Sequence, residues 1–309
     1  MNGNALLSIA LKPKTAADRE RLARGVTTLM AADPAMSVEA DPATGEFVIA
    51  GMGERHLEII IDRLREFNVE AAVGRVQVAY KEALTRPSDG EGRYARHGQY
   101  GHVKLHLYPG EAGSGFVFEN AIVGGAIPNT FVTPIAEGIE EALTAGVVAG
   151  YPVDDVRVVL YDGSYHDLDS SDISFRIAGV IAFHDAATKA MPVVLEPVMR
   201  VEVTTPPEYA GDVIGNLSKR RGRIQSQVGR GGAQIIQLRV PLSAMLGYAT
   251  DLRSRTLGRG TFVMEFEGYQ PCDPGGNQGA GDDSMVGAPR RPRPPLRASS
   301  VALPEPLEE

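Results

Sequence analysis

The order of apolar patterns in the first 80 residues constrains this chain more than any other feature of its sequence. Alternating or continuous apolar runs predict strands at 5–12, 37–40, 47–50 and 69–78, and helical spacing predicts helices at 15–30 and 54–67. This order, strand, helix, two strands, helix, strand, is the split βαβ arrangement. We therefore predict a ferredoxin-like domain over residues 1–80.

The same order of elements returns over residues 199–270. Strands are expected at 199–204, 223–228, 233–240 and 261–266, with one helix from Pro207 to about 221 and another over 242–256. Residues 81–198 predict three strands, a helix, a strand and a helix, which is an α+β domain. The fold class is thus α+β, with two ferredoxin-like βαββαβ domains flanking a central α+β domain.

The last 39 residues, 271–309, have a different composition. They are dense in Pro, Gly, Arg and Ser and show no apolar period. Such a segment buries too little apolar surface to offset the entropy lost on ordering. We predict a disordered tail.

Cysteine usage and hydropathy bear on the compartment. Cys272 is the single cysteine, so the chain cannot hold an internal disulfide, and a reducing compartment fits. The N-terminus lacks the basic and apolar regions of a signal peptide, and no apolar run is long enough to span a bilayer. We expect a soluble, cytoplasmic protein without a membrane partner.

Charge is unevenly distributed along the chain. The formal net charge is −8, and residues 81–198 alone hold sixteen acidic and eight basic residues. In contrast, residues 216–260 hold nine Lys or Arg and one acid, Asp251. Because local potential steers phosphate binding more than total charge does, this basic segment favours contact with nucleic acid.

Motifs of common enzymes are missing from the sequence. It contains no phosphate-binding loop of the Gly-x-x-x-x-Gly-Lys-Ser/Thr type, no Gly-x-Ser-x-Gly and no His-Glu-x-x-His. The glycine-rich run at 229–232 lies between two predicted strands, so we interpret it as a hairpin turn. We predict no catalytic residue, no metal site and no bound cofactor.

The polar loop after the predicted strand at 155–161 carries His166 among several aspartates. A calcium loop starting at Asp167 would need Gly and Glu where Asp172 and Ala178 stand, so calcium is excluded. Two hypotheses stay open. The His166/Asp cluster serves a stand-alone hydrolase as a general base, or the aspartates and serines cap a helix that starts near Ser171.

Several long motifs resemble one family. They are GMGERHLEI (51–59), GQYGHV (98–103), GGAIP (124–128), YDGSYHDLDSS (161–171), LEPVMRVEVT (195–204), GDVIGNLSKRRG (211–222) and GYATDLRS (247–254). In this order they resemble the C-terminal half of elongation factor G, the bacterial translational GTPase that moves tRNA and mRNA through the ribosome. The resemblance runs from about Leu6 to Gln270.

The resemblance implies the family's third, fourth and fifth domains, the fourth being of the ribosomal-protein-S5-domain-2-like type. Two tip loops, the first tip loop (93–101) and the second tip loop (162–172), would face tRNA and mRNA through Arg96, His97, Gln99, Ser164, Tyr165, His166 and Asp167. Ribosomal RNA would meet Lys219, Arg220, Arg221, Arg223, Arg253, Arg255 and Arg259. An interdomain relay segment would comprise Gly51, Met52, Gly53, Glu54, His56 and Glu58.

Departures from the family pattern shape the expected function. Arg55 stands where Leu is usual, and the first tip loop lacks the family's Gly-rich insert before Gly98. The sequence contains neither a GTPase domain nor a β-barrel domain, so GTP would enter only through a separate GTPase polypeptide. We expect a ribosome-binding translocation module, half of a split factor or a truncated product, that binds rRNA of both subunits. The alternative is a non-functional folded remnant; the stand-alone hydrolase is the third hypothesis.

Overall fold

The computed structural model describes residues 5–40, 45–96 and 98–272, and it divides into two compact units. The described residues up to Ala83 and from Val193 onward form unit 1, and Leu84–Pro192 forms unit 2. Within these described ranges, no helix is both long and apolar enough to cross a membrane.

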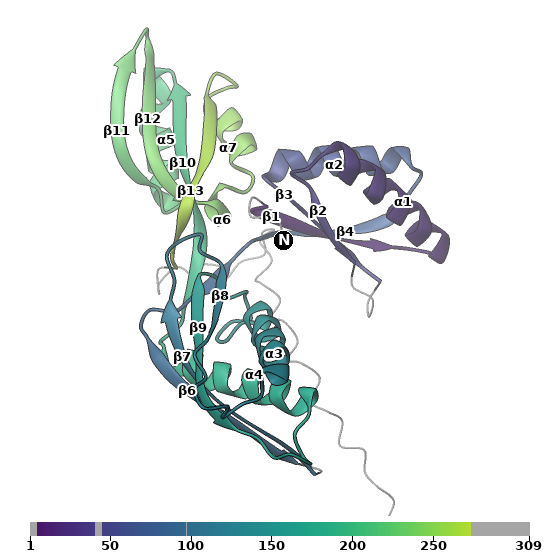
Figure 1. The fold of residues 1–309 in the computed structure, drawn as a ribbon. Helices are drawn as coiled ribbons and strands as arrows, with labels where there is room; N and C mark the ends of the chain where they lie inside the picture. The colour runs from purple at the N-terminus through teal and green to yellow at the C-terminus, as the bar shows by residue number, and fades with distance from the viewer. Residues whose placement is uncertain (1–4, 41–44, 97, 273–309) are drawn as a thin grey trace, which may run out of the picture. The chain divides into compact units, whose positions relative to one another are not determined.

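The N-terminal domain of unit 1 has the predicted order of elements (Figure 1). Its elements are β1 (Leu7–Pro13), α1 (Ala16–Ala32), β2 (Ser37–Ala40), β3 (Phe47–Gly51), α2 (Glu54–Glu66) and β4 (Ala71–Val78). The strands form an antiparallel sheet in the order β2-β3-β1-β4. This is the ferredoxin-like topology, so the predicted fold of this region is confirmed.

The N-terminal cap and the apolar face of α1 are those that the sequence predicted. Thr15 caps the helix, because its hydroxyl accepts a hydrogen bond from the backbone N–H of Asp18 at 3.1 Å. Leu22, Val26 and Leu29 lie on the buried face of α1. They meet the buried alternate residues of β1 and the apolar face of α2, which are Leu7, Ile9, Leu11, Leu57, Ile60 and Leu64.

The C-terminal domain of unit 1 repeats this topology. Its elements are β10 (Val193–Thr205), α5 (Pro207–Lys219), β11 (Arg223–Arg230), β12 (Ala233–Pro241), α6 (Leu242–Met245), α7 (Tyr248–Arg255) and β13 (Thr261–Pro271). The sheet order is β11-β12-β10-β13, and β5 (Lys81–Ala83) adds to β10. This second ferredoxin-like fold is also confirmed. Its last strand includes Pro271, where the tail was predicted to begin, and the predicted tail beyond Cys272 lies outside the described residues. Unit 2 is therefore inserted in the chain between two paired strands.

One predicted helix in this domain was wrong. The sequence predicted a single helix over 242–256, whereas the structure has two short helices, α6 and α7. Leu246 is extended at ψ 129°, and Gly247 has φ 70°, in the left-handed region that glycine adopts without steric cost. The glycine therefore ends one helix and starts the next.

The expected hairpin at 229–232 is confirmed, with positive φ at Gly231 and Gly232 between β11 and β12.

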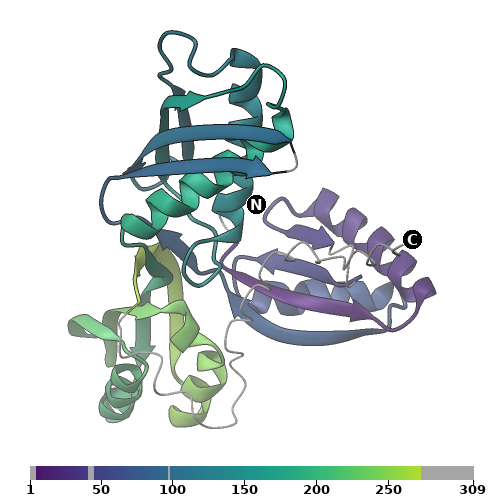
Figure 2. The same ribbon diagram turned by 90° about the horizontal axis from the view of Figure 1, so that it is seen from below.

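Unit 2 is an α+β domain whose two helices lie on one face of its sheet (Figures 1 and 2). Its elements are β6 (Ser88–Arg96), β7 (Gln99–Pro109), β8 (Phe116–Asn120), the 3-10 turn η1 (Asn129–Phe131), α3 (Val132–Ala145), β9 (Val156–Ser164) and α4 (Asp172–Lys189). The sheet order is β6-β7-β9-β8, with β8 parallel to β9. The predicted α+β class is confirmed.

Helix α4 packs unusually close to β6 because both elements present small residues. A Cβ added to Gly92 would lie 2.0 Å from the Ala178 carbonyl oxygen, and one added to Gly90 would lie 2.1 Å from that of Ala182. Ala178 and Ala182 are fully buried. This contact fixes α4 against the sheet and thereby fixes the loop that precedes it.

Candidate nucleic-acid interface

The second tip loop, predicted over 162–172, is shorter in the structure: β9 extends through Ser164 and α4 starts at Asp172, so residues 165–171 join them. Ser171 is the N-cap of α4, and its hydroxyl accepts from the Ser174 backbone N–H at 3.2 Å. The Ser174 hydroxyl in turn accepts from the Ser171 N–H at 3.0 Å. This reciprocal capping box satisfies two backbone donors and ends the loop at a defined residue. The predicted helix cap is therefore present at Ser171.

A further pair of hydrogen bonds closes the loop around His166. The His166 backbone N–H donates to the Ser170 hydroxyl at 2.9 Å, and the Ser170 N–H donates to the His166 carbonyl at 3.0 Å. The His166 Nδ1 lies 3.8 Å from a carboxylate oxygen of Asp169. The loop thus forms a closed turn that carries the imidazole.

The side chains of this turn face solvent. Leu168 is 97% exposed, Tyr165 is 39% exposed, and the His166 side chain is 58% exposed. Residues 165–169 line a shallow, open depression formed by the loop alone. Among the described residues, no group of three or more His, Cys, Asp or Glu is arranged to hold a metal ion. The arrangement can offer hydrogen bonds and stacking to a large partner.

The first tip loop, predicted over 93–101, is shorter in the structure, because β6 runs through Arg96 and β7 starts at Gln99. Arg96 and Gln99 are opposite each other in the β6–β7 register, and Gly98 has φ 70°. His97, also predicted to belong to the tip, lies outside the described residues. The Tyr100 backbone N–H donates to the Asp169 carbonyl at 2.7 Å and so joins the two loops. Arg96, Gln99 and the Ser164–Asp167 stretch therefore lie at the same end of the sheet.

A chain of side chains that the sequence did not reveal supports the second tip loop. The Ser164 hydroxyl lies 2.7 Å from the Tyr100 hydroxyl and 3.0 Å from Nδ1 of His102. Nε2 of His102 lies 2.7 Å from a carboxylate oxygen of Glu91. Period-two spacing could have placed Tyr100 and His102 on one face of β7. Their pairing with Ser164 depends on a register shift at Lys104/Leu105, which the sequence does not signal.

The relay segment is built around His56. The Met52 backbone N–H donates to His56 Nδ1 at 3.2 Å, so Nε2 carries the proton and donates to Asp33 at 2.8 Å. This hydrogen bond from His56 is the main cause that holds the pKa of Asp33 below its ordinary value. A Cβ on Gly51 would lie 2.8 Å from His56 Nδ1, so the segment needs glycine there. His56 therefore has a structural role, while Met52 and Glu58 are exposed.

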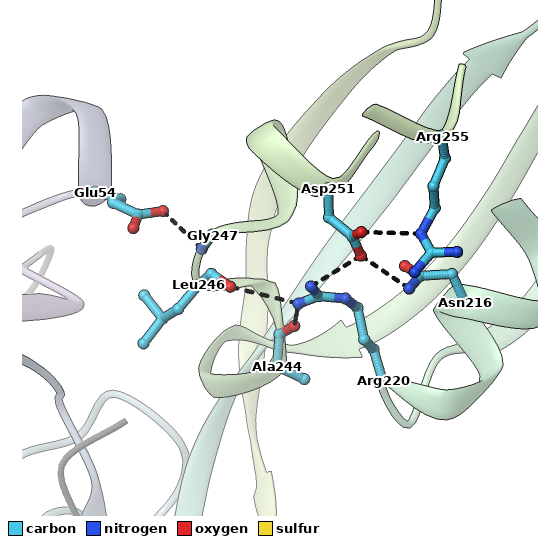
Figure 3. Close-up of polar contacts among 8 residues, drawn as sticks. All are labelled: Glu54, Asn216, Arg220, Ala244, Leu246, Gly247, Asp251 and Arg255. Atoms are coloured by element: carbon cyan, nitrogen blue, oxygen red, sulfur yellow. Dashed lines mark hydrogen bonds and ion pairs between the residues drawn. The ribbon is translucent and has the colours of Figure 1, made fainter. Parts of the chain in front are cut away.

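Glu54 connects the relay segment to the C-terminal domain within unit 1. Its carboxylate accepts the Gly247 backbone N–H at 3.1 Å, as Figure 3 shows. This N–H is at the break between α6 and α7, where no helical partner is available to it. The relay segment thus contacts the other ferredoxin-like domain, a contact that the sequence did not predict.

Arg220 stabilises the same junction between α6 and α7. Its guanidinium donates to the carbonyls of Ala244 and Leu246 and to the Asp251 carboxylate (Figure 3). Burial works to raise the pKa of Asp251, but hydrogen bonds from Arg220, Asn216 and Arg255 outweigh it and hold that pKa below its ordinary value. Arg220 therefore organises the domain more than it presents charge to solvent.

Arg221 is likewise paired inside the domain. It forms two hydrogen bonds, at 2.7 and 3.1 Å, to Glu196, whose side chain is 6% exposed, and a third to Ser243. Arg255 and Arg259 are exposed but form ion pairs with Asp251 and Glu208. In the described part of the chain, the exposed Lys219 and Arg253 form no ion pair. Arg223 is exposed at the start of β11.

The open face of the C-terminal sheet adds basic residues that the sequence analysis did not select. Cross-strand register places Arg223 opposite Arg239 and Arg239 opposite Arg200, so three arginines form one row. Glu265 pairs with Arg200, and Glu267 pairs with Arg239. The three arginines lie on β11, β12 and β10, and the two glutamates lie on the neighbouring strand β13. Only the strand register brings these residues together.

The fold and these surfaces define a class: two ferredoxin-like domains around an inserted α+β unit with an exposed histidine loop. Family models match the chain in order, as elongation factor G domain III at 3–75, domain IV at 76–191 and the elongation factor G C-terminus at 193–277. The chain therefore belongs to the elongation factor G family and carries these three domains.

A solved structure gives a second comparison. The crystal structure of a protein from Thermus thermophilus is similar to this chain, with a TM-score of 0.65 and 38% sequence identity. The similarity covers 88% of this chain and 41% of that protein. This chain thus corresponds to less than half of its solved relative.

Proposed function

We propose that this chain is the ribosome-engaging part of an elongation-factor-G-like translation factor and acts in the movement of tRNA and mRNA. The single observation that carries the proposal is the match of three family domains, in order, between residues 3 and 277. Three independent matches in the family's order support a shared mode of action.

In this proposal the second tip loop, with Arg96 and Gln99 of the first, faces tRNA and mRNA. Tyr165, His166 and Leu168 support this role because their side chains are exposed. The rings of Tyr165 and His166 can stack on bases, and Nδ1 or Nε2 of His166 can form a hydrogen bond with RNA. Unit 2 outside the loop is acidic, so affinity for phosphate must come from elsewhere in the chain.

The C-terminal domain supplies that affinity in the proposal. Lys219, Arg223 and Arg253 are exposed, and Arg255 and Arg259 can exchange a carboxylate partner for an RNA phosphate. Arg220 and Arg221 serve this face indirectly, by holding the domain together. GTP hydrolysis needs a phosphate-binding loop, which residues outside 1–309 would have to provide, on this polypeptide or on a separate one.

The proposal is tested by co-sedimentation of the full chain with ribosomes at rising salt. Binding at low salt that weakens steeply as salt rises supports it, since phosphate contacts release counterions. A folded chain that does not co-sediment at low salt would instead favour the non-functional remnant. Hydrolysis of ester or phosphate substrates that is lost in His166→Ala would favour the stand-alone hydrolase.

A further inference from the structure

The organisation of the tip around one tyrosine, Tyr100, is not evident from the sequence motifs. Tyr100 is the second residue of β7 and belongs to the first tip loop as predicted over 93–101. Its backbone N–H, backbone carbonyl, ring and hydroxyl each contact the second tip loop or the first turn of α4. Tyr100 thus contacts several parts of the second tip loop at once.

The backbone contacts of Tyr100 anchor the ends of the loop. The N–H donates to Asp169, and the carbonyl accepts from the hydroxyls of Ser170 and Ser174, at 2.9 and 2.8 Å. The neighbouring Gly101 permits this approach, because a Cβ there would lie 2.7 Å from the Ser174 carbonyl oxygen. These bonds do not depend on the Tyr100 side chain.

The side chain of Tyr100 contacts the functional part of the loop. Its ring centroid lies 4.2 Å from that of His166, with the planes tilted by 35°. Its hydroxyl bonds to Ser164, the last residue of β9. The Arg93 guanidinium lies 5.5 Å from the centroid of the same ring. The side chain therefore limits where the exposed imidazole can point.

The hydrogen-bond chain from Glu91 sets the donor direction of the Tyr100 hydroxyl when His102 is neutral. The Glu91 carboxylate can only accept, so Nε2 of His102 donates to it, and in the neutral imidazole Nδ1 then accepts from the Ser164 hydroxyl. Ser164 Oγ is left to accept from Tyr100. The ring that contacts His166 is thus tied, through Ser164 and His102, to β6.

We infer that Tyr100 is a positioning residue: its ring holds the His166 imidazole in one orientation for contact with RNA. The RNA part of this inference rests on the proposed function, whereas the orientation of His166 in the free protein does not. A positioned side chain binds without first losing conformational entropy, so releasing it weakens binding.

The experiment compares three variants of the full chain. Tyr100→Leu removes the ring and the hydroxyl but keeps the backbone anchors. Tyr100→Phe keeps the ring. Tyr108→Leu is the matched control, because Tyr108 is on the same face of β7 and its ring lies 5.0 Å from Arg157, not against the loop.

The first readout is the NMR shift of the His166 ring protons in the free protein, assigned with His166→Gln among the six histidines. Tyr100→Leu should move these resonances toward those of an unstacked imidazole, while Tyr100→Phe and Tyr108→Leu should leave them near their wild-type positions. Wild-type His166 shifts in Tyr100→Leu would overturn the inference, because the ring would then not contact the imidazole.

The second readout is affinity for ribosomes. Tyr100→Leu should weaken binding by about two- to tenfold, the range that an aromatic pair contributes, and Tyr100→Phe should largely restore it. Equal affinity of wild type and Tyr100→Leu, with the His166 shifts changed, would overturn the positioning role. A wild-type chain that binds no ribosomes would sink the proposed function instead, and the shifts would still decide the orientation of His166.

Discussion

The second tip loop and the basic part of the C-terminal domain are held in place by different interactions. The loop is held mostly by hydrogen bonds between uncharged groups, a capping box and a ring contact, with one ion pair from Lys104 to Asp162, and its outward side chains are exposed. In the C-terminal domain the structure is held by charged pairs, above all Arg220 with Asp251 and Arg221 with Glu196. A basic sequence segment therefore contains arginines of two kinds, and only one kind is available to a phosphate.

The largest expected effect is on the buried ion pair of the C-terminal domain. Arg221→Ala leaves the Glu196 carboxylate, 6% exposed, without its charged partner. Breaking a buried pair in this way costs about 3–5 kcal/mol. Chemical denaturation should report this loss for Arg221→Ala and almost none for Arg253→Ala. Equal stability of the two variants would mean that Arg221 is not a structural arginine.

The next effect concerns the glycines beneath α4 in unit 2. Gly92→Ala places a Cβ 2.0 Å from the Ala178 carbonyl oxygen, so the helix or the strand must move, at about 1–3 kcal/mol. Gly211→Ala in α5 is the matched control, since no atom lies within 4 Å of its Cβ and alanine is the better helix former. Thermal unfolding should show opposite signs for the two variants. A stabilising Gly92→Ala would contradict the close packing of α4.

Acid should weaken the C-terminal network through Asp251. The pKa of Asp251 is below its ordinary value in the folded protein, so its ionised form stabilises the fold above about pH 4, the unfolded value. This stabilisation is lost as the pH falls through the folded pKa. Unfolding measured from pH 6 to pH 2 should therefore show a smaller acid-induced loss in Asp251→Asn than in wild type. Leu168→Ser, which changes no titratable group, should keep the wild-type profile, and identical profiles for all three would refute the role of Asp251.

The smallest effects on stability are expected at the exposed residues of both regions. Leu168→Ser and Arg253→Ala should each change the free energy of unfolding by less than about 0.5 kcal/mol, because neither side chain is packed. Denaturant titration checks this. A larger loss for Leu168→Ser would mean that its side chain packs in solution, which would limit its contact with a partner.

Much of the fold could be predicted because its signals are local. The strand and helix periods of both ferredoxin-like domains, the Thr15 cap and the turn at Gly231–Gly232 each depend on residues close in sequence. The helix predicted over 242–256 failed because Gly247 can be read as part of a helix until its left-handed conformation is known.

The candidate site was harder to predict because its contacts join distant residues. Arg221 looks like an exposed basic residue until Glu196, on β10, is found beside it. Tyr100 contacts residues 64 to 74 positions further along the chain, and the row of Arg223, Arg239 and Arg200 exists only through strand register. Sequence motifs identified the two tip loops but not the residues that hold them.

The most direct test of the account is the salt dependence of ribosome binding for three forms of the chain. The wild-type affinity should fall linearly with salt on a logarithmic plot. Lys219→Ala/Arg253→Ala should reduce that slope by about one to two, because each lost phosphate contact removes about 0.7–0.9 from it. His166→Ala should weaken binding with the slope unchanged. A double variant with the wild-type slope, or a His166→Ala variant with a reduced one, would contradict the division between a phosphate-binding face and a tip that binds through stacking and hydrogen bonds.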